Sequence, residues 1–320
     1  MNSATRKALA LSKVLFLLTA VIAAPSVHAA PIACSNPALV LSASCRWAIV
    51  AASSGQTVTV RTGAGATTDE SVCGDLSRWA GSTTGSLVVS ATNADGILFE
   101  AVSAVDVDIV TGGAALNTLT YATIPGTSLK TLAGGSTAAK SPMGTADTTG
   151  SHSLRSVCDN DHSSLAAAVP VLNGEVATQD RGDLDLAPGE ELTIDVMGAG
   201  LSVIDFSDFR MGTESTLTLS ASNNDVVMLR VTDGRLLMGN AATIALTGGL
   251  TPDHVLIYVE PASTCKLGKN VHGSGTLFCP LAHRLQVGVG ADWTGTFLGA
   301  SKELRLREGA GLTHVPFTGF

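Results

Sequence analysis

The sequence predicts a mostly β protein, a right-handed β-solenoid (β-helix) with an irregular N-terminal β region and a short helix. The first observation is a repeat, because MGTESTLTLS (211–220) returns 27 positions later as MGNAATIALT (238–247). The second is composition: hydrophobic residues make up 45% of the chain, but charged residues only 14% and aromatic residues only 4%. Gly, Ala, Ser and Thr fill the difference, and small and β-branched residues favour strands and tight corners over helices.

The first residues predict export. Arg6 and Lys7 precede the apolar stretch VLFLLTAVIAA, and Val27 and Ala29 fit a small-residue cleavage site after Ala29 or Ala30. The stretch is shorter than the roughly 18 apolar residues of a membrane span, so residues 1–29 are predicted to be a signal peptide. The mature chain is then expected to be secreted (extracellular, periplasmic or at the cell surface), without an integral membrane span.

The net charge of the chain limits the classes of partner that it is expected to bind. The sequence has 19 Lys and Arg against 27 Asp and Glu, and Arg6, Lys7 and Lys13 leave with the signal peptide, so the mature balance is 16 − 27 = −11. An acidic surface argues against nucleic acid and anionic membranes as partners.

The cysteines predict disulfides, because an exported chain with an even number of them usually oxidises them. Closeness in the sequence favours the pairs Cys34–Cys45 and Cys265–Cys279, which leaves Cys73–Cys158 as the third. The alternative for Cys34 is acylation, as in a lipoprotein. A zinc site is the alternative for the cysteines as a set, but no CxxC or paired-His spacing supports it, so no metal or cofactor is predicted.

The repeat predicts stacked coils. After the spacing of 27, LGKNVHGSGTLF at Leu267 and VGVGADWTGTFL at Val287 are 20 residues apart, and LRLREGAGLTHVPF follows from Leu304. A spacing near 20 suits one solenoid coil of about three short strands around a shared core. Gly212 and Gly239 are expected at coil corners, where the backbone needs a positive φ or a close approach. The alternative is two hairpins of a β-sandwich.

The rest of the chain divides by pattern. Residues 30–116 contain strand-like runs between Gly-rich turns and form the β-rich N-terminal region. Residues 117–170 are rich in Gly, Ser and Thr and are predicted to be an excursion or linker, with a short helix at HSSLAAAV (162–169). The solenoid domain is assigned to residues 171–320.

Residues 211–317 resemble the secreted microbial ice-binding proteins that are built on a discontinuous β-solenoid. The resemblance rests on the strands 227–231 and 255–259, the Thr-bearing coil 243–249, the GTL motif at 275–277 and the Gly-rich closing coil 295–300. It covers about a third of the chain. It implies a solenoid fold and, as an activity, the binding of ice or ordered water.

A binding face is predicted from alternation within the strands. In STLTLS, Leu217 and Leu219 point inward, as Ile244 and Leu246 do in ATIALT, and the residues between them point outward. Outward hydroxyls then align from coil to coil, and Thr276, Thr294 and Thr296 are candidates for extending the array. A solvent-facing role for Thr is the plainer alternative. The predicted binding residues are Thr216, Thr218, Ser220, Thr243 and Thr247.

Other functions have weaker support in the sequence. A cell-surface or matrix protein that binds glycans or proteins is the second hypothesis. A polysaccharide-active enzyme is the third, with Asp106 and Asp108 as paired acids on one strand face. Asp159, Asp161 and His162 are expected in a loop, and Arg181-Gly182-Asp183 is a chance match to an adhesion tripeptide. The sequence has no Ser-His-Asp order or GxSxG elbow, so no catalytic residue is assigned and the protein is not expected to be an enzyme.

Overall fold

The structure is a computed structural model of the chain. It describes residues 40–45, 47–53, 56–63, 65–69, 72–78, 82–83, 87–89, 98–100, 109–111, 118–120, 129–131, 153–196, 200–260, 264–300 and 302–319. The predicted signal peptide and Asp106 with Asp108 lie outside these residues. None of the helices within them is long and apolar enough to cross a membrane.

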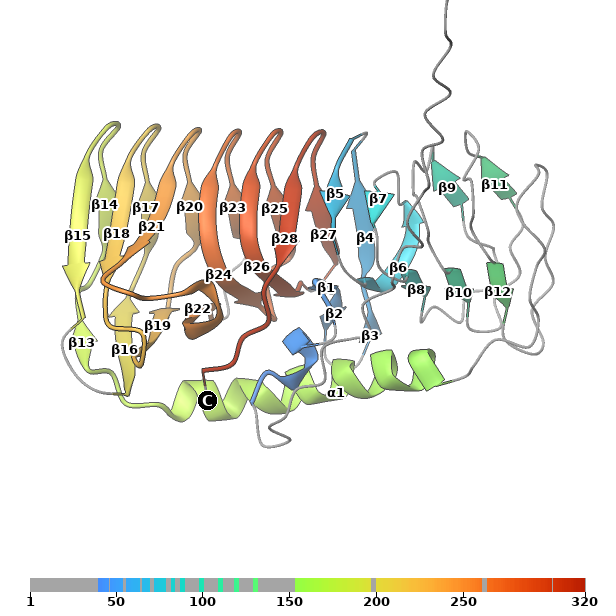
Figure 1. The fold of residues 1–320 in the computed structure, drawn as a ribbon, viewed down its shortest axis with the longest axis horizontal. Helices are drawn as coiled ribbons and strands as arrows, with labels where there is room; N and C mark the ends of the chain where they lie inside the picture. The colour runs from blue at the N-terminus through green and yellow to red at the C-terminus, as the bar shows by residue number, and fades with distance from the viewer. Residues whose placement is uncertain are drawn as a thin grey trace, which may run out of the picture.

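The chain forms a β-solenoid in which each coil contributes up to three short strands, one to each of three faces (Figure 1). Neighbouring coils pair their strands in parallel, and the prediction of a mostly β solenoid is confirmed. The three faces are named here by what they carry: the Thr face, the Arg face and the helix face.

The Thr face is turned toward the viewer in Figure 1. Its strands are β15 (Glu191–Asp195), β18 (Thr216–Ser220), β21 (Thr243–Thr247), the first halves of β24 (His272–Cys279) and β26 (Asp292–Gly299), β28 (Gly311–His314), β5 (Thr67–Thr68) and β7 (Ser82–Thr83).

The Arg face lies behind it. Its strands are β14 (Leu184–Leu186), β17 (Phe209–Met211), β20 (Leu236–Met238), β23 (Thr264–Leu267), β25 (Arg284–Val287), β27 (Glu303–Leu306), β4 (Thr59–Thr62) and the second half of β6 (Val72–Arg78).

The helix face is covered by α1 (Ser153–Gly174). Its strands are β13 (Gln179–Asp180), β16 (Leu201–Phe206), β19 (Val226–Val231), β22 (Val255–Val259), the second halves of β24 and β26, β1 (Ile49–Val50), the first half of β6, β8 (Leu87–Val89), β10 (Ile109–Thr111) and β12 (Leu129–Thr131). Outside the three faces are η1 (Ser42–Cys45), η2 (Pro252–His254), the antiparallel pair β2 (Ala52–Ser53) and β3 (Gln56–Thr57), and the parallel pair β9 (Leu98–Glu100) and β11 (Thr118–Thr120).

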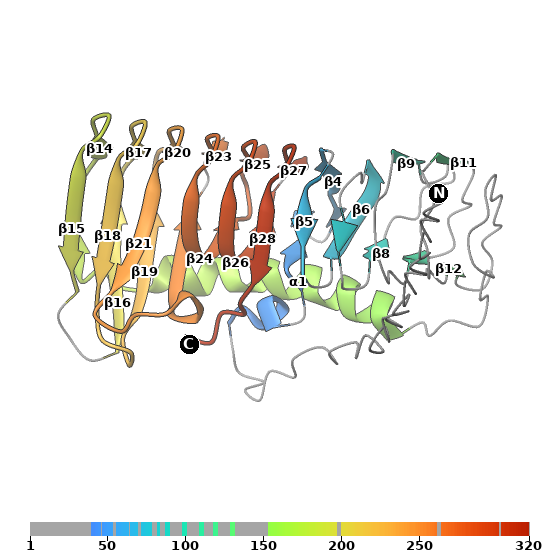
Figure 2. The same cartoon turned by 45° about the horizontal axis from the view of Figure 1, so that its top comes forward.

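The coils are not stacked in chain order. The C-terminal strand β28 pairs with β5, where Gly311 is opposite Thr67, and β27 pairs with β4. The N-terminal strands therefore continue the solenoid beyond its C-terminal coil, and α1 runs back along one side to the coil that begins with β13 (Figures 1 and 2). The solenoid is continuous in space but interrupted in sequence.

Helix α1 is much longer than the sequence indicated, with 22 residues. Among the helix residues whose burial is described (164–174), Leu165, Ala168 and Leu172 are buried at a helical spacing and pack on the helix face. The Gly, Ser and Thr content of residues 117–170 and their weak periodicity predicted a linker, with only a short helix at 162–169. The expected loop containing Asp159 and His162 was wrong, because both residues lie in α1.

A buried arginine holds the end of α1 on the solenoid. Arg230 of β19 is 7% exposed. Its Nη1 donates to the carbonyl oxygens of Leu172, Asn173 and Glu175 at 3.0, 3.2 and 2.9 Å. Its Nε and Nη2 donate to the two carboxylate oxygens of Asp205 at 2.9 and 2.8 Å. These bonds to Asp205 raise the pKa of Arg230 despite its burial, so the guanidinium stays charged and caps the helix C-terminus.

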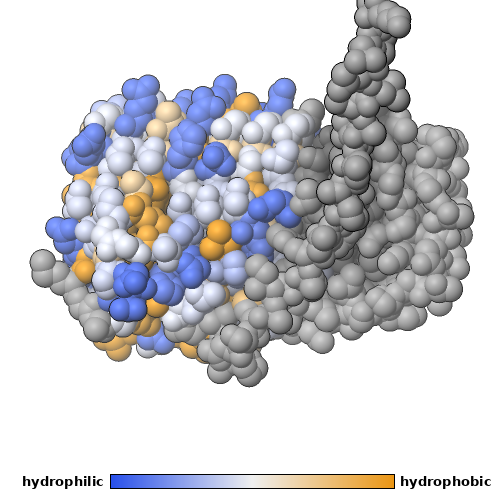
Figure 3. Space-filling view, in the orientation of Figure 1, coloured by the Kyte–Doolittle hydropathy of each residue, from blue (hydrophilic) through white to orange (hydrophobic). Residues whose placement is uncertain are grey.

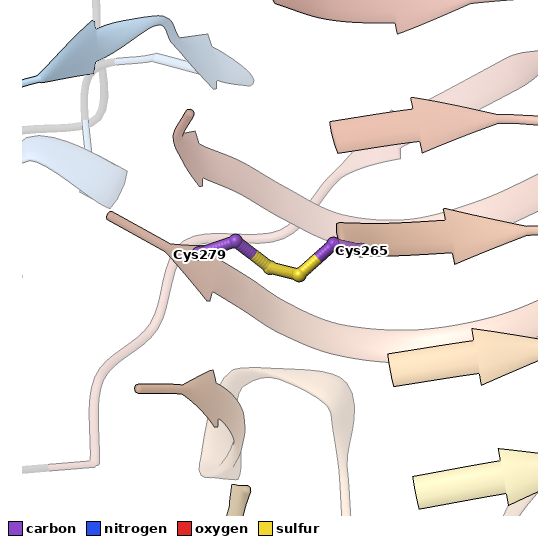
Figure 4. The surroundings of a disulfide bond; sticks show 2 residues. All are labelled: Cys265 and Cys279. Atoms are coloured by element: carbon purple, nitrogen blue, oxygen red, sulfur yellow. A yellow bond between two sulfur atoms is a disulfide. The ribbon is translucent and has the colours of Figure 1, made fainter. Parts of the chain in front are cut away.

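The interior is a continuous apolar core of mostly aliphatic residues, which also contains the rings of Phe206, Phe209, Trp293 and Phe297. Leu217, Leu219 and Ile244 are buried in it as expected, and Leu246 packs against it partly buried. A disulfide joins Cys265 on β23 to Cys279 at the end of β24, which ties two faces of one coil together (Figure 4).

That disulfide confirms one predicted pair. Cys45 and Cys73 each take part in a disulfide as well. Cys34 and the side chain of Cys158 lie outside the described part of the chain, so the other two pairings stay predictions.

Candidate functional site

The Thr face carries a central row of hydroxyl side chains. Thr193 is opposite Thr218, and Thr218 is opposite Ala245. In the coils that follow, Ser274 is opposite Thr294, and Thr294 is opposite Thr313. Ser274 stands two residues after His272, which pairs with Thr243, and so continues the row after Ala245.

The geometry of this row is regular. Successive coils are about 4.8 Å apart, and alternate residues along one strand about 6.7 Å apart. Its six members are half-buried or exposed and uncharged, and five of them carry a hydroxyl group. Thr also presents a methyl group, so the row combines small apolar groups with hydrogen-bonding oxygens at fixed spacings.

Two further rows flank the central one. On one side, Thr216 is opposite Thr243, and on the other side Ser220 is opposite Thr247. The flanking rows carry charged or titratable side chains in the coils on either side. Glu191 and Asp195 of β15 are opposite Thr216 and Ser220, and the row from Thr243 continues to His272 and Asp292. In Figure 3 pale residues of intermediate hydropathy cover much of the described coils in this view, and strongly hydrophilic residues lie mostly along the edges.

A column of glycines keeps these coils in register at the corner between the Arg face and the Thr face. A Cβ at Gly239 would lie 2.6 Å from the carbonyl carbon of Gly212, and one at Gly268 would lie 2.5 Å from the carbonyl oxygen of Gly239. A Cβ at Gly288 would in turn overlap the carbonyl of Gly268. The predicted corner positions of Gly212 and Gly239 are thus explained by close backbone approach.

The structure brings the five predicted binding residues together on one face. Thr216, Thr218 and Ser220 lie on β18, and Thr243 and Thr247 lie on β21, in the predicted register. That they bind a ligand stays a prediction.

The candidate extension of the array is only partly right. Thr294 joins the central row, but Thr276 and Thr296 do not, because β24 and β26 bend at Gly275 (φ 112°) and Gly295 (φ 150°) onto the helix face. Both threonines are fully buried there, and the Thr296 hydroxyl donates to the carbonyl oxygen of Val315 at 3.1 Å.

Sequence reasoning missed three members of the central row: Thr193, Ser274 and Thr313. The signal for Thr193 was present, since ELTID stands 25 residues before TLTLS with the same alternation. Thr313 could have been found from the offset of 19 between Trp293 and Leu312, the inward neighbours of Thr294 and Thr313.

The other candidate residues that the structure describes lie outside the Thr face. Asp159, Asp161 and His162 lie in α1, and their side chains are outside the described part of the chain. Gly182, in the middle of the adhesion-like tripeptide, has a φ of 63° in the turn between β13 and β14. Among the described residues there is no group of three His, Cys, Asp or Glu that could hold a metal ion.

The fold and this face define a class: a β-solenoid with one long helix on its side and a face of small hydroxyl residues. No protein-family model and no curated protein matches the chain. Among solved structures, the chain is similar to an ice-binding protein from the Antarctic ascomycete Antarctomyces psychrotrophicus, with 14% identity, a TM-score of 0.49 and coverage of 86% of this chain and 97% of that one.

Two further solved structures are similar to the chain. One is a glycosylated ice-binding protein from an Arctic yeast, with 16% identity, a TM-score of 0.47 and coverage of 89% of this chain and 98% of that one. The other is the DUF3494 domain of an ice-binding protein from Shewanella frigidimarina, with 17% identity, a TM-score of 0.43 and coverage of 82% and 95%. Residues 211–317 resemble proteins of this kind in sequence pattern as well.

Proposed function

We propose that this protein is an exported, non-catalytic ice-binding protein and that the Thr face is its ice-binding surface. The observation that carries the proposal is the central row from Thr193 to Thr313, in which hydroxyl and methyl groups recur at one position of successive coils. Water held at such regular oxygens can match the repeating oxygen positions of an ice surface, and ordered water bridges polar groups almost as well as a direct hydrogen bond.

The absence of charge in the central row supports ice over a charged ligand. An ion-binding or catalytic surface needs charged or titratable side chains that converge. The row from Thr193 to Thr313 has none, and its members lie side by side rather than around a cleft. A rigid backbone is also required, because mobile side chains would not hold water in a lattice. The parallel ladders and the glycine column supply that rigidity.

The test is ice recrystallisation inhibition and crystal shaping by the oxidised full-length protein. Thr218→Tyr places a bulky ring in the middle of the central row and should abolish both effects. Thr264→Tyr is the matched control, because Thr264 is a half-buried outward residue of β23 on the Arg face. Circular dichroism should show both variants folded. A folded wild-type protein without ice activity, or equal losses in the two variants, would overturn the proposal.

A further inference from the structure

Cations gather on the Arg face of a chain whose net charge is −8. Outward positions of successive strands follow in register from Lys266 to Gln286, Arg305 and Arg61. The next register position beyond Arg61 is Arg78. With about 4.8 Å between coils, the line from Lys266 to Arg61 is about 14 Å long. Lys266, Arg305, Arg307 and Arg61 are called the basic row below.

Among the described residues, three arginines of the basic row, Arg305, Arg307 and Arg61, make no ion pair. Arg305 is directly opposite Arg61 in the ladder, and Arg307 follows Arg305 at the next outward position. Within the described part of the chain, the ion pairs involve other cations, such as Arg284, which pairs with Glu303 at 2.6 Å. Like charges opposite each other in a sheet destabilise it. Burial, and then Arg307 and Arg61, lower the pKa of Arg305, and the charge of Glu303 offsets this only in part. The fold therefore carries a repulsion that an anionic ligand would relieve.

We propose that the basic row binds a linear, uronic-acid-rich polysaccharide that lies across the coils along the solenoid axis. The spacing of the coils is close to the rise of one sugar unit in an extended chain. Carboxylates of such a chain can therefore meet Lys266, Arg305 and Arg61, with the neutral Gln286 opposite one sugar between the first two. Three of the four cations are arginines, and the planar guanidinium fork matches a carboxylate with two parallel hydrogen bonds. This function belongs to a different face from the proposed ice-binding surface.

The geometry favours a polysaccharide over duplex nucleic acid. Duplex phosphates wind around a wide cylinder, so a straight and narrow row of cations meets few of them at a time. The acidic remainder of the protein repels any polyanion that spreads beyond the row. A single extended chain stays within the row and avoids that repulsion.

The experiment measures binding of the full-length, oxidised protein to alginate, a polyuronate, at low and high salt. Neutral dextran and duplex DNA are the comparison ligands. Arg305→Glu reverses the central charge of the row and should weaken alginate binding at least about tenfold. Arg181→Glu is the matched control, with the same change in net charge. Arg181 is exposed in the turn before β14, five coils from β27, and its substitution should change affinity by less than about twofold.

The outcomes separate this proposal from the ice-binding one. Salt-sensitive binding to alginate that is lost in Arg305→Glu and kept in Arg181→Glu supports the basic row, whatever the ice assay gives. Thr218→Tyr should leave alginate binding unchanged, and Arg305→Glu should leave ice shaping unchanged. No alginate binding, equal losses in the two charge variants, or tighter binding to duplex DNA than to alginate would overturn the proposal.

Discussion

Replacing Arg230 with methionine should detach the end of α1 from the solenoid. The change removes five hydrogen bonds: two to the carboxylate of Asp205 and three to the carbonyl oxygens of Leu172, Asn173 and Glu175. It also leaves Asp205 without the cation that lies 2.8 Å away. Methionine fills much of the same volume, so the loss is of charge and hydrogen bonding rather than of packing.

The magnitude follows from the exposure of the partners. Removing one member of a buried ion pair costs about 3–5 kcal/mol. The side chain of Asp205 is 17% exposed, so water reaches the orphaned carboxylate, and the lower end, about 3 kcal/mol, applies. At about 2–4 °C per kcal/mol for a chain of this size, the unfolding midpoint should fall by about 6–12 °C.

Thermal unfolding followed by circular dichroism measures this loss, and amide hydrogen exchange locates it. Exchange should accelerate first in the last turns of α1, because local opening needs less free energy than global unfolding. Arg235→Met is the control, since the Arg235 side chain is 48% exposed and its Nε lies as far as 4.0 Å from the carboxylate of its partner Asp208. Exposed pairs contribute about 0–1 kcal/mol. A loss in Arg230→Met no larger than in Arg235→Met would refute the view that Arg230 anchors the helix.

Two further predictions test the stacking and the turns of the coils. Gly288→Ala should destabilise the fold by about 1–3 kcal/mol or more in denaturant titrations, because its Cβ would overlap the Gly268 carbonyl. Gly174→Ala, with open space around it, should cost far less, and equal costs would contradict the glycine column. Hydrogen bonds from the Ser222 hydroxyl and amide hold the pKa of Asp225 below 3.8, so its carboxylate stabilises the fold above about pH 4 and ceases to as pH falls through the lowered pKa. The stability difference between wild type and Asp225→Asn should shrink below that pH; a difference independent of pH would count against it.

The repeating coils could be predicted from the sequence, but the order in which the coils stack could not. Alternation in 216–220 and 243–247 predicted the inward and outward residues because one face of each strand must be buried. Offsets between paired positions vary, with 25 residues from Glu191 to Thr216, 27 to Thr243 and 29 to His272. The added residues lie outside the paired strand positions, so the ladder stays regular while the sequence period does not. This is why Ser274 was missed.

No pattern in the sequence indicated that the N-terminal strands pair with the C-terminal coil and extend the solenoid. The contact of Gly311 and Leu312 with Thr67 and Thr68 involves two short segments far apart in the chain, and any pair of short apolar-alternating strands would serve as well. Helix α1 was underestimated for a related reason. The face that the helix covers was unknown from the sequence, so the spacing of Leu165, Ala168 and Leu172 did not stand out.

The three faces explain why the repeat is strict at some positions and loose at others. Inward positions must be apolar in nearly every coil, as Leu217, Ile244 and Trp293 are, and corner positions such as Gly268 must be small on any face. Outward positions have no such constraint, and they differ by face: hydroxyls from Thr193 to Thr313, apolar Met228 and Leu256 under α1, and unpaired arginines around Arg305. Burial under the helix accounts for the second set. Folding requires neither the hydroxyl row nor the arginines around Arg305, so these two outward rows are the ones for which we propose ligand binding.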